Sequence, residues 1–338
     1  MNKTSIRSAA ILTLGALALT GCTNKNEEDA GASGDNEVTV AFVPKLQGIP
    51  YFEAMNAGGE KAAEEMGVNW LYQGPTTADA AAQADIVRSF IQQGVDTLIV
   101  ASNDPDSMAP LLQQAQDAGI HVATSDTDAP NSVREVFVNQ TTAENHGKAL
   151  ADSLTEAMGD NGEFAIVSCS PTAANLNSYI DVITSEIEQN HPDVELVDTV
   201  YAGEDQAKAA AMATDLMNAH PDLEGIIGLC SAAAPGVAQA VEDAGKVGEV
   251  FTVGGATPNA MAPYLKEGSA SASVLWDVED LGYLTAWAGQ RLAEGQEFDT
   301  EFDVNEDITG VQYDESTKTL LLGPPLVFTA ENVDQYDY

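Results

Sequence analysis

The sequence predicts an α/β protein built from two doubly wound parallel-sheet lobes. Short β-branched runs alternate with longer amphipathic stretches, beginning with VTVAFV at 38–43 and YFEAMNAGGEKAAEEMG at 51–67. Strands that are buried on both faces and separated by helices indicate a parallel sheet with right-handed crossovers. The same rhythm begins again near residue 142, so we expect two similar lobes rather than one continuous sheet.

The first half contains a regular series of these elements. We predict strands at 38–43, 68–73, 96–102, 120–126 and 135–140, and helices at 51–67, 78–93 and 106–118. Gly67, Gly94 and Gly119 stand where these helices end. Glycine is common just after a last helical turn because it adopts the left-handed conformation without strain.

The second half repeats the series and adds a final quarter. We predict helices at 142–158, 174–190, 205–219 and 234–244, and strands at 163–168, 194–202, 225–230 and 249–255. The last quarter adds a helix at 258–267, a strand at 271–277, a helix at 278–294 and a closing β segment at 320–328.

The composition is that of a strongly acidic globular protein. The chain has 338 residues, 44% of them hydrophobic, and 53 Asp and Glu against 13 Lys and Arg give a net charge of −40. Such a charge disfavours binding to nucleic acid, which requires a basic face, and to anionic lipid through basic patches. The acidic residues are spread along the chain and indicate a solvated, self-repelling surface. Adaptation to saline surroundings is an alternative explanation.

Residues 1–22 resemble a bacterial lipoprotein signal peptide. Lys3 and Arg7 precede an apolar stretch at 9–20 that is too short to span a bilayer, and LTGC ends at Cys22. We expect cleavage before Cys22 and lipidation of its thiol; an ordinary signal peptide with a chance cysteine is the alternative. The polar residues 23–37 suit a flexible tether. The protein is therefore expected to be exported and held by lipid at the extracytoplasmic face of a bacterial membrane.

Polar and aromatic side chains follow nearly every predicted strand. In open parallel sheets, ligands bind beyond the carboxyl ends of the strands. Carboxylates and amides bond hydroxyl groups, and aromatic faces cover apolar faces of a sugar ring. We expect the rare cation Lys45 to be held among Asp126, Asp128 and Asp277. The full set of predicted ligand-binding residues is Lys45, Tyr51, Phe52, Asn103, Asp126, Asp128, Gln140, Pro171, Asn175, Asn177, Ser231, Trp276 and Asp277.

Motifs of catalysis do not occur in the sequence. It has no GxxxxGK[ST], GxGxxG or GxSxG motif, and its four histidines show no HExxH spacing. His191 and His220 each precede a proline at a predicted helix end, where we interpret them as structural. We therefore expect no enzyme activity, no cofactor and no metal.

Several segments together resemble the type I solute-binding proteins of ABC importers, the ribose-binding-like group. The segments are FVPKLQGIPYF (42–52), YQGPTTADAAAQ (72–83), TSDTD (124–128), FVNQ (137–140), SPTAANLNSY (170–179), LWDV (275–278) and VFTAENVDQYDY (327–338). They are most similar to the branch that binds rhamnose and autoinducer-2. The resemblance covers 38–338, essentially the whole predicted mature domain.

The resemblance implies two lobes joined by three hinge crossovers, closing on one small molecule. We assign 38–141 and 256–276 to the first lobe, and 142–255 and 277–338 to the second. The implied partners are a sugar, an ABC permease and its ATPase, and a membrane through the lipid anchor only, with the protein a monomer. A receptor that reports the same ligand to a signalling or chemotaxis partner is the alternative.

The ligand contacts of the autoinducer-2 branch are only partly present. Lys45 and Asp126 match its ligand-contacting positions. Asn175 and Leu176 replace an Asp-Gln pair, and 229–231 (LCS) replaces Pro-Asp-Ala. The lost carboxylate and amide disfavour autoinducer-2 and favour rhamnose or another monosaccharide.

The resemblance also gives the two internal cysteines a place. Cys169 and Cys230 end the first and third strands of the second half, and these strands lie side by side in this fold. Bridged Cα atoms usually lie roughly 4.4–6.8 Å apart, which neighbouring strands permit. We therefore hypothesise a disulfide at the cleft wall; two buried free thiols are the alternative.

Overall fold

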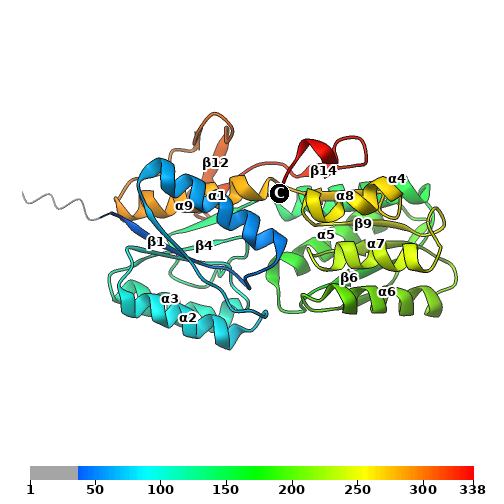
Figure 1. Cartoon of the computed structure of the whole chain (residues 1–338), viewed down its shortest axis with the longest axis horizontal. Coiled ribbons are helices and arrows are strands. Elements are labelled where there is room, and N and C mark those ends of the chain that lie inside the picture. Colours follow the sequence, from blue (N-terminus) through cyan, green and yellow to red (C-terminus); the bar gives the residue numbers. More distant parts are fainter. Residues whose placement is uncertain (1–36) are drawn as a thin grey trace, which may run out of the picture. The chain divides into compact units, whose positions relative to one another are not determined.

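Two α/β lobes, each built on one sheet, make up the part of the chain that the computed structural model describes, residues 37–338 (Figure 1). The predicted signal peptide, the proposed lipidation site Cys22 and nearly all of the tether lie outside these residues. No helix within 37–338 has both the length and the apolar character that crossing a membrane requires.

The first lobe has a sheet of mostly parallel strands in the order β11-β12-β13-β5-β4-β3-β1-β2. The parallel strands are β1 (Thr39–Val43), β2 (Asn69–Tyr72), β3 (Thr97–Val100), β4 (His121–Ser125) and β5 (Val136–Asn139). β13 (Thr319–Leu321) pairs parallel to β5, and β12 (Val311–Asp314) and β11 (Glu301–Phe302) follow antiparallel. The order β2-β1-β3-β4-β5 is the doubly wound arrangement that the sequence predicts.

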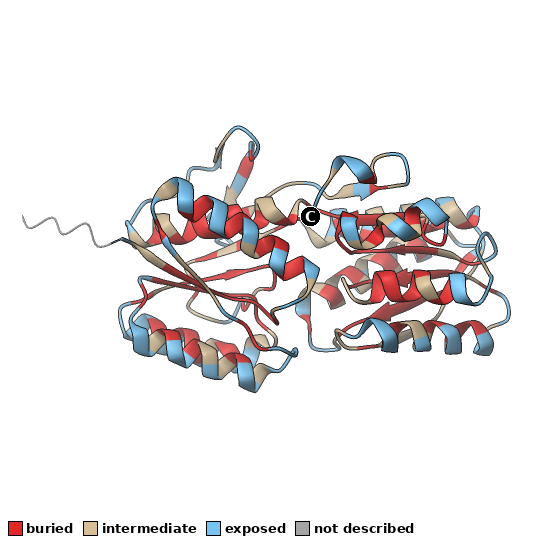
Figure 2. Cartoon of the chain, viewed as in Figure 1, coloured by how far each residue is buried: buried red, intermediate tan, exposed pale blue. Residues whose placement is uncertain are grey.

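Helices cover both faces of this sheet because successive strand residues point to opposite sides. Ala41 and Val43 of β1 pack with α2 (Ala80–Gln93) and α3 (Pro105–Asp117). Val40 and Phe42 belong to the core under α1 (Pro50–Met66) and α9 (Val278–Ala293). Figure 2 shows buried strands between helices whose outer sides are exposed.

The second lobe repeats the arrangement with a sheet ordered β14-β10-β9-β8-β6-β7. Its parallel strands are β6 (Gly162–Ser168), β7 (Val194–Tyr201), β8 (Leu223–Gly228), β9 (Phe251–Gly254) and β10 (Ala272–Leu275), and β14 (Leu326–Phe328) pairs antiparallel with β10. α4 (Ala143–Met158) packs beside α5 (Ala174–Asn190), and α6 (Gln206–Ala219) beside α7 (Ala233–Asp243). α8 (Pro258–Glu267) lies against α7 and the short helix η1 (Val333–Gln335).

The predicted assignment of the last quarter to the lobes is wrong except at its end, where β14 and η1 belong to the second lobe as expected. We expected 256–276 in the first lobe and 277–338 in the second. Strand β10 instead pairs with β9 in the second lobe, while α9 packs on β1, β3, β4 and β5 of the first. The physical reason is that β10 extends the second sheet by pairing with the free edge of β9. Helix α9 joins the first lobe because glycines on α1 and α9 allow these two helices to pack closely.

The chain crosses between the lobes three times, as the resemblance implies. The crossings lie at 140–142 between β5 and α4, at 276–277 between β10 and α9, and at 322–325 between β13 and β14. Three short connections restrict the lobes to hinge-like motion about one side of the cleft.

Candidate functional site

A cavity lies between the lobes at the carboxyl ends of their parallel strands. The space that the centre of a water-sized sphere can occupy in it is about 50 Å³. Its lining residues are Lys45, Ile49, Tyr51, Phe52, Asp126, His146, Asn175, Leu176, Glu204, Leu229, Cys230, Ser231, Gly255 and Leu275. Both lobes contribute, and both do so where the strand order reverses, the usual place for a ligand in doubly wound sheets.

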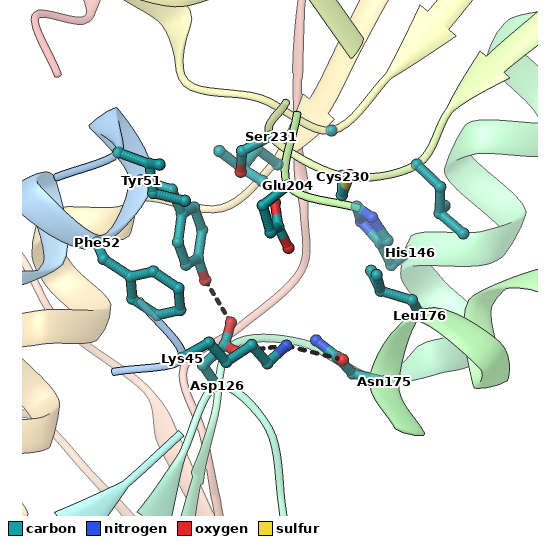
Figure 3. Close-up of a pocket in the computed structure, with 14 residues that line it drawn as sticks. Lys45, Tyr51, Phe52, Asp126, His146, Asn175, Leu176, Glu204, Cys230 and Ser231 are labelled. Carbon is teal, nitrogen blue, oxygen red and sulfur yellow. Dashed lines mark hydrogen bonds and ion pairs between the residues drawn. The ribbon is translucent and has the colours of Figure 1, made fainter. Parts of the chain in front are cut away.

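An ion pair forms one wall of the cavity. Lys45, which follows β1, is only 8% exposed, and its Nζ lies 3.3 Å from Asp126 Oδ2. Tyr51 and Thr127 donate hydroxyl hydrogen bonds of 2.8 and 2.7 Å to the same carboxylate. Burial and the charge of Asp126 raise the pKa of Tyr51 well above its ordinary value, so the hydroxyl keeps its proton. Figure 3 shows Tyr51 and Lys45 converging on Asp126.

The backbone around this pair is fixed by neighbouring amides. Asp126 has a φ of 62°, in the left-handed region that few residues other than glycine adopt, although Asp tolerates it better than most. Asn103 donates to the Lys45 carbonyl at 2.8 Å, and Gln83 donates to the carbonyls of Pro44 and Ala101. The loops after β1 and β3 are thus held together by buried hydrogen bonds.

Asn175 brings the second lobe to this wall. Its Oδ1 accepts a hydrogen bond of 3.3 Å from Lys45 Nζ, so one ammonium group contacts a residue of each lobe. Asn175 lies in the first turn of α5, next to the apolar Leu176. Separation of the lobes at this wall would lengthen or break this hydrogen bond.

Glu204 projects into the cavity from the second lobe, on the side facing Lys45 and Asp126 (Figure 3). Burial raises the pKa of Glu204, the charge of Asp126 raises it further, and Lys45 opposes the shift. Behind it, Cys169 and Cys230 are joined in a disulfide with Cα atoms 6.0 Å apart. The bridge links the loops after β6 and β8, and Cys230 lines the cavity.

His146 completes the cavity from the first turn of α4. Its ring lies 4.5 Å from that of Tyr179 and 5.3 Å from that of Trp276, between centroids. The side chain is 1% exposed, and burial lowers its pKa to about 3, so the imidazole is neutral near pH 7. Its Nδ1 has no hydrogen-bond partner among the described residues. Trp276 in turn packs edge-on against Tyr51.

Comparison with known proteins identifies the family. A family profile described as a periplasmic binding protein domain matches residues 40–297. The chain belongs to this family. Periplasmic binding proteins of this kind capture solutes for transport and are not enzymes, in agreement with the expectation from the sequence.

Individual periplasmic binding proteins resemble the chain over most of its length. The ribose import binding protein RbsB of Bacillus subtilis is 24% identical over 85% of this chain and 93% of its own. The structure of LsrB from Clostridium saccharobutylicum in complex with AI-2 is 29% identical with a TM-score of 0.83, covering 89% of this chain and all of that one. A Clostridium phytofermentas solute-binding protein with bound L-rhamnose is 27% identical with a TM-score of 0.83, covering 89% and 98%.

The structure brings together about half of the residues predicted for the binding site of this periplasmic binding protein. Six of them line the cavity: Lys45, Tyr51, Phe52, Asp126, Asn175 and Ser231. Three others support it from behind. Asn103 holds the Lys45 loop, buried Gln140 donates to Tyr179 Oη and the Asp126 carbonyl, and Trp276 packs on Tyr51.

Four predicted residues serve elsewhere. Asp128 forms an ion pair with Arg134 and accepts from Thr124, and Asp277 accepts from the Asp280 amide as the N-cap of α9. The expectation that Lys45 is held among three aspartates is therefore wrong, because only Asp126 of the three pairs with it. The Asn177 side-chain amide donates a hydrogen bond of 2.9 Å to the Pro171 carbonyl, and neither residue lines the cavity.

Two titratable residues that line the cavity, Glu204 and His146, were missed by sequence reasoning. Glu204 follows β7 in the segment YAGED, so the rule that polar residues follow strands would have found it. His146 lies on a helix that only the hinge crossing brings to the cavity, and no local pattern distinguishes it.

Proposed function

We propose that the chain is the extracytoplasmic sugar-binding component of an ABC importer, which captures rhamnose or another monosaccharide between its lobes and delivers it to a permease. The observation that carries this proposal is the composition of the cavity. Lys45 and Asn175 offer donors, and Asp126 and Glu204 offer acceptors for hydroxyl groups. Phe52, Leu176 and Leu275 supply apolar surface for the carbon face of a sugar ring.

The comparisons support a sugar as the ligand class. Relatives named for ribose import and a structural neighbour with bound L-rhamnose share the fold over most of the chain. A sugar that contacts both lobes binds the closed form more tightly and shifts the population toward it. The permease would then recognise the closed form.

Autoinducer-2 is the second candidate, because the LsrB structure with AI-2 is as similar in fold as the rhamnose-bound one. Asn175 and Leu176 stand where the autoinducer-2 binders carry Asp and Gln, and the loss of a carboxylate and an amide favours a sugar. A receptor role in signalling would use the same binding event. Loss of labelled-sugar uptake from cells that lack this protein would support transport over signalling.

A thermal-shift screen against L-rhamnose, other pentoses and hexoses, and autoinducer-2 tests the proposal. We expect at least one monosaccharide to raise the melting temperature by several degrees, because ligand at 100 times its Kd stabilises by about 2.7 kcal/mol. Stabilisation by autoinducer-2 alone would favour the second candidate. Protection by none of these compounds would contradict both.

The proposed lipid anchor has a separate test. We expect the wild-type protein to partition with the membrane fraction and to incorporate labelled palmitate, and a Cys22→Ser variant to incorporate none. Equal incorporation of palmitate by both proteins, or by neither, would contradict the anchor without bearing on sugar binding. We also propose that the exported protein is a monomer, which light scattering measures directly.

A further inference from the structure

The charges around the cavity do not balance. Among the described residues that line it, Lys45 is the only Lys or Arg, whereas Asp126 and Glu204 both contribute carboxylates. His146 adds no charge near pH 7, because burial lowers the pKa of its imidazole to about 3. Two adjoining cavities share Asp126 or Glu204 with this one, and no Lys or Arg of the described chain lines either of them. When both carboxylates are ionised, one negative charge is therefore in excess.

The charge of Asp126 is compensated inside its own lobe. Lys45 Nζ lies 3.3 Å from its Oδ2, and the hydroxyl groups of Tyr51 and Thr127 donate to the same carboxylate. The Lys45 ammonium group donates a second hydrogen bond to Asn175. One N–H of Lys45 is left for an oxygen of a ligand. The excess negative charge is consequently that of Glu204.

Glu204 has no partner of either kind in the described part of the chain. It forms no ion pair there and receives no hydrogen bond from an N–H or O–H group. The Cys169 sulfur 3.3 Å away is part of the disulfide and carries no hydrogen. Figure 3 shows the Glu204 carboxylate directed into the cavity. A partly desolvated carboxylate without donors is costly, so a ligand that brings a positive charge to it gains most.

The charge of the whole protein acts in the same direction. The chain has 53 Asp and Glu against 13 Lys and Arg, a net charge of −40. A negative field raises the concentration of cations at a cleft and lowers that of anions, over a distance of roughly 8 Å at physiological ionic strength. Glu204 and the exposed Asp205 lie next to one another at the start of α6. A cationic solute is thus favoured both during approach and inside the cavity.

A metal ion does not fit the position beside Glu204. Among the described residues, the side chains that could act as ligands together with Glu204 are Cys169 and Cys230. Their sulfurs are joined in the disulfide, whereas a metal binds the free thiolate. Calcium and magnesium require several oxygen ligands, and Glu204 supplies only its own carboxylate. The positive charge must therefore belong to an organic ligand.

We propose that the ligand is an amino sugar, a monosaccharide in which an ammonium group replaces one hydroxyl and binds Glu204. The ring oxygens accept from Lys45 and Asn175, and the ring carbons lie against Phe52 and Leu176. Sugars that carry a carboxylate or a phosphate are rejected, because their charge adds to that of Glu204. This proposal rests on the proposed function, because it requires a monosaccharide in the cavity, and it narrows the class of that monosaccharide.

Titration calorimetry on the exported protein with matched sugars tests the proposal. The pairs are D-glucose with D-glucosamine and with the derivative aminated at the exocyclic carbon, D-galactose with D-galactosamine, and D-mannose with D-mannosamine. In each pair an ammonium group replaces a hydroxyl of similar size. We expect at least one amino sugar to bind about tenfold or more tightly than its parent, because a partly buried charge pair outweighs a hydrogen bond from a hydroxyl. D-glucuronic and D-galacturonic acid should bind more weakly than their parents.

Two variants show whether Glu204 is responsible. Glu204→Gln keeps the shape of the side chain and removes its charge, so the ratio of amino-sugar to parent affinity should fall by about tenfold. Asp205→Asn is the matched control, since Asp205 is exposed, does not line the cavity, and caps α6 through a hydrogen bond that Asn also accepts. It should leave the ratio unchanged. An equal fall in both variants would assign the preference to the field of the acidic surface and contradict the role of Glu204.

The outcomes separate this proposal from the proposed function. If neutral monosaccharides bind as tightly as their amino counterparts or more tightly, the amino sugar is wrong and the proposed function stands. A ratio unchanged by Glu204→Gln, in a protein of normal melting temperature, has the same meaning. If no sugar binds, whether neutral or aminated, both proposals fail.

Discussion

Lys45 of the first lobe and Asn175 of the second are joined across the cleft, with 3.3 Å between Lys45 Nζ and Asn175 Oδ1. This hydrogen bond holds the lobes together at the edge of the proposed sugar site. The same ammonium group is paired with Asp126 inside its own lobe. The cross-lobe contact and the pairing within the lobe can therefore be tested separately.

Asn175→Ala should weaken sugar binding about tenfold, because a hydrogen bond to a charged group contributes about 1.5–3 kcal/mol and 1.4 kcal/mol corresponds to tenfold. The unliganded melting temperature should change little, since Lys45 keeps Asp126. Titration calorimetry measures the affinity. Asn177→Ala, two residues along the same helix, is the control, because Asn177 does not line the cavity. An equal loss in both variants would mean that the loop, not the contact, matters.

The effects of Lys45 and Asp126 on the free energy of unfolding should be strongly coupled to one another. Lys45→Met leaves Asp126, which is 4% exposed, with only the Tyr51 and Thr127 hydroxyls as donors, and should lower the free energy of unfolding by about 3 kcal/mol. Asp126→Asn leaves the ammonium without its counter-ion and should also destabilise. The double variant should lose less than the sum of the two, as measured by urea unfolding. Additive losses would show that the two charges act independently.

The order of strands and helices within each lobe could be predicted from the sequence because each element has its own local pattern of apolar residues. Strands such as β1 are runs of mostly apolar residues, and their neighbouring helices carry one apolar face. The lobe to which the last quarter belongs could not be predicted in this way. Both sheets present the same type of edge, so only the contacts of β10 and α9 in three dimensions show which lobe each element joins.

The site was predictable where a side chain follows a strand directly. Lys45 and Asp126 do, and they line the cavity. Asp128 follows the same strand as Asp126, yet Arg134 binds it, because the left-handed turn at Asp126 directs the next residues away from the cavity. His146 reaches the cavity only because the chain crosses between the lobes just before α4. No residue spacing in the sequence indicates that crossing.

Glycines on α1 and α9 should prove essential for the first lobe. A Cβ added to Gly58 would overlap the Glu279 carbonyl, and one added to Gly282 would overlap the Met55 carbonyl. Gly58→Ala should therefore destabilise by about 1–3 kcal/mol, although alanine is the better helix former. Ala57→Gly at the exposed neighbouring position is the comparison and should cost about 1 kcal/mol through helix propensity alone. Stabilisation by Gly58→Ala in a denaturant titration would contradict the close helix contact.

Asp280 should make stability fall as pH rises. Burial, followed by the charges of Asp277 and Asp307, raises its pKa to about 7 from an ordinary value of 3.8. The native state therefore binds the proton more tightly than the unfolded chain, and the stability this gives is present below pH 4 and lost between pH 4 and 7. Asp280→Asn should stabilise by about 1–2 kcal/mol at pH 8, after discounting for solvent screening, and by almost nothing at pH 4. Calorimetry at the two pH values measures this, with the exposed Asp299→Asn as the charge control. The same gain at both pH values would exclude titration of Asp280 as the cause.

The disulfide between Cys169 and Cys230 should be a major source of stability for the second lobe. The cysteines are 61 residues apart, and closing a loop of that length stabilises by about 4 kcal/mol in the chain-entropy description. Dithiothreitol should therefore lower the melting temperature of the wild-type protein but not that of a Cys169→Ser variant, which has already lost the bridge. The chain has three cysteines, so the thiols are counted in a Cys22→Ser background, where the unfolded protein should show none before reduction and two after. Two thiols before reduction would exclude the bridge.

Because Cys230 lines the cavity and the Cys169 sulfur contacts Glu204, reduction of the disulfide should also weaken sugar binding. Stability lost without any change in sugar affinity would limit the bridge to a structural role.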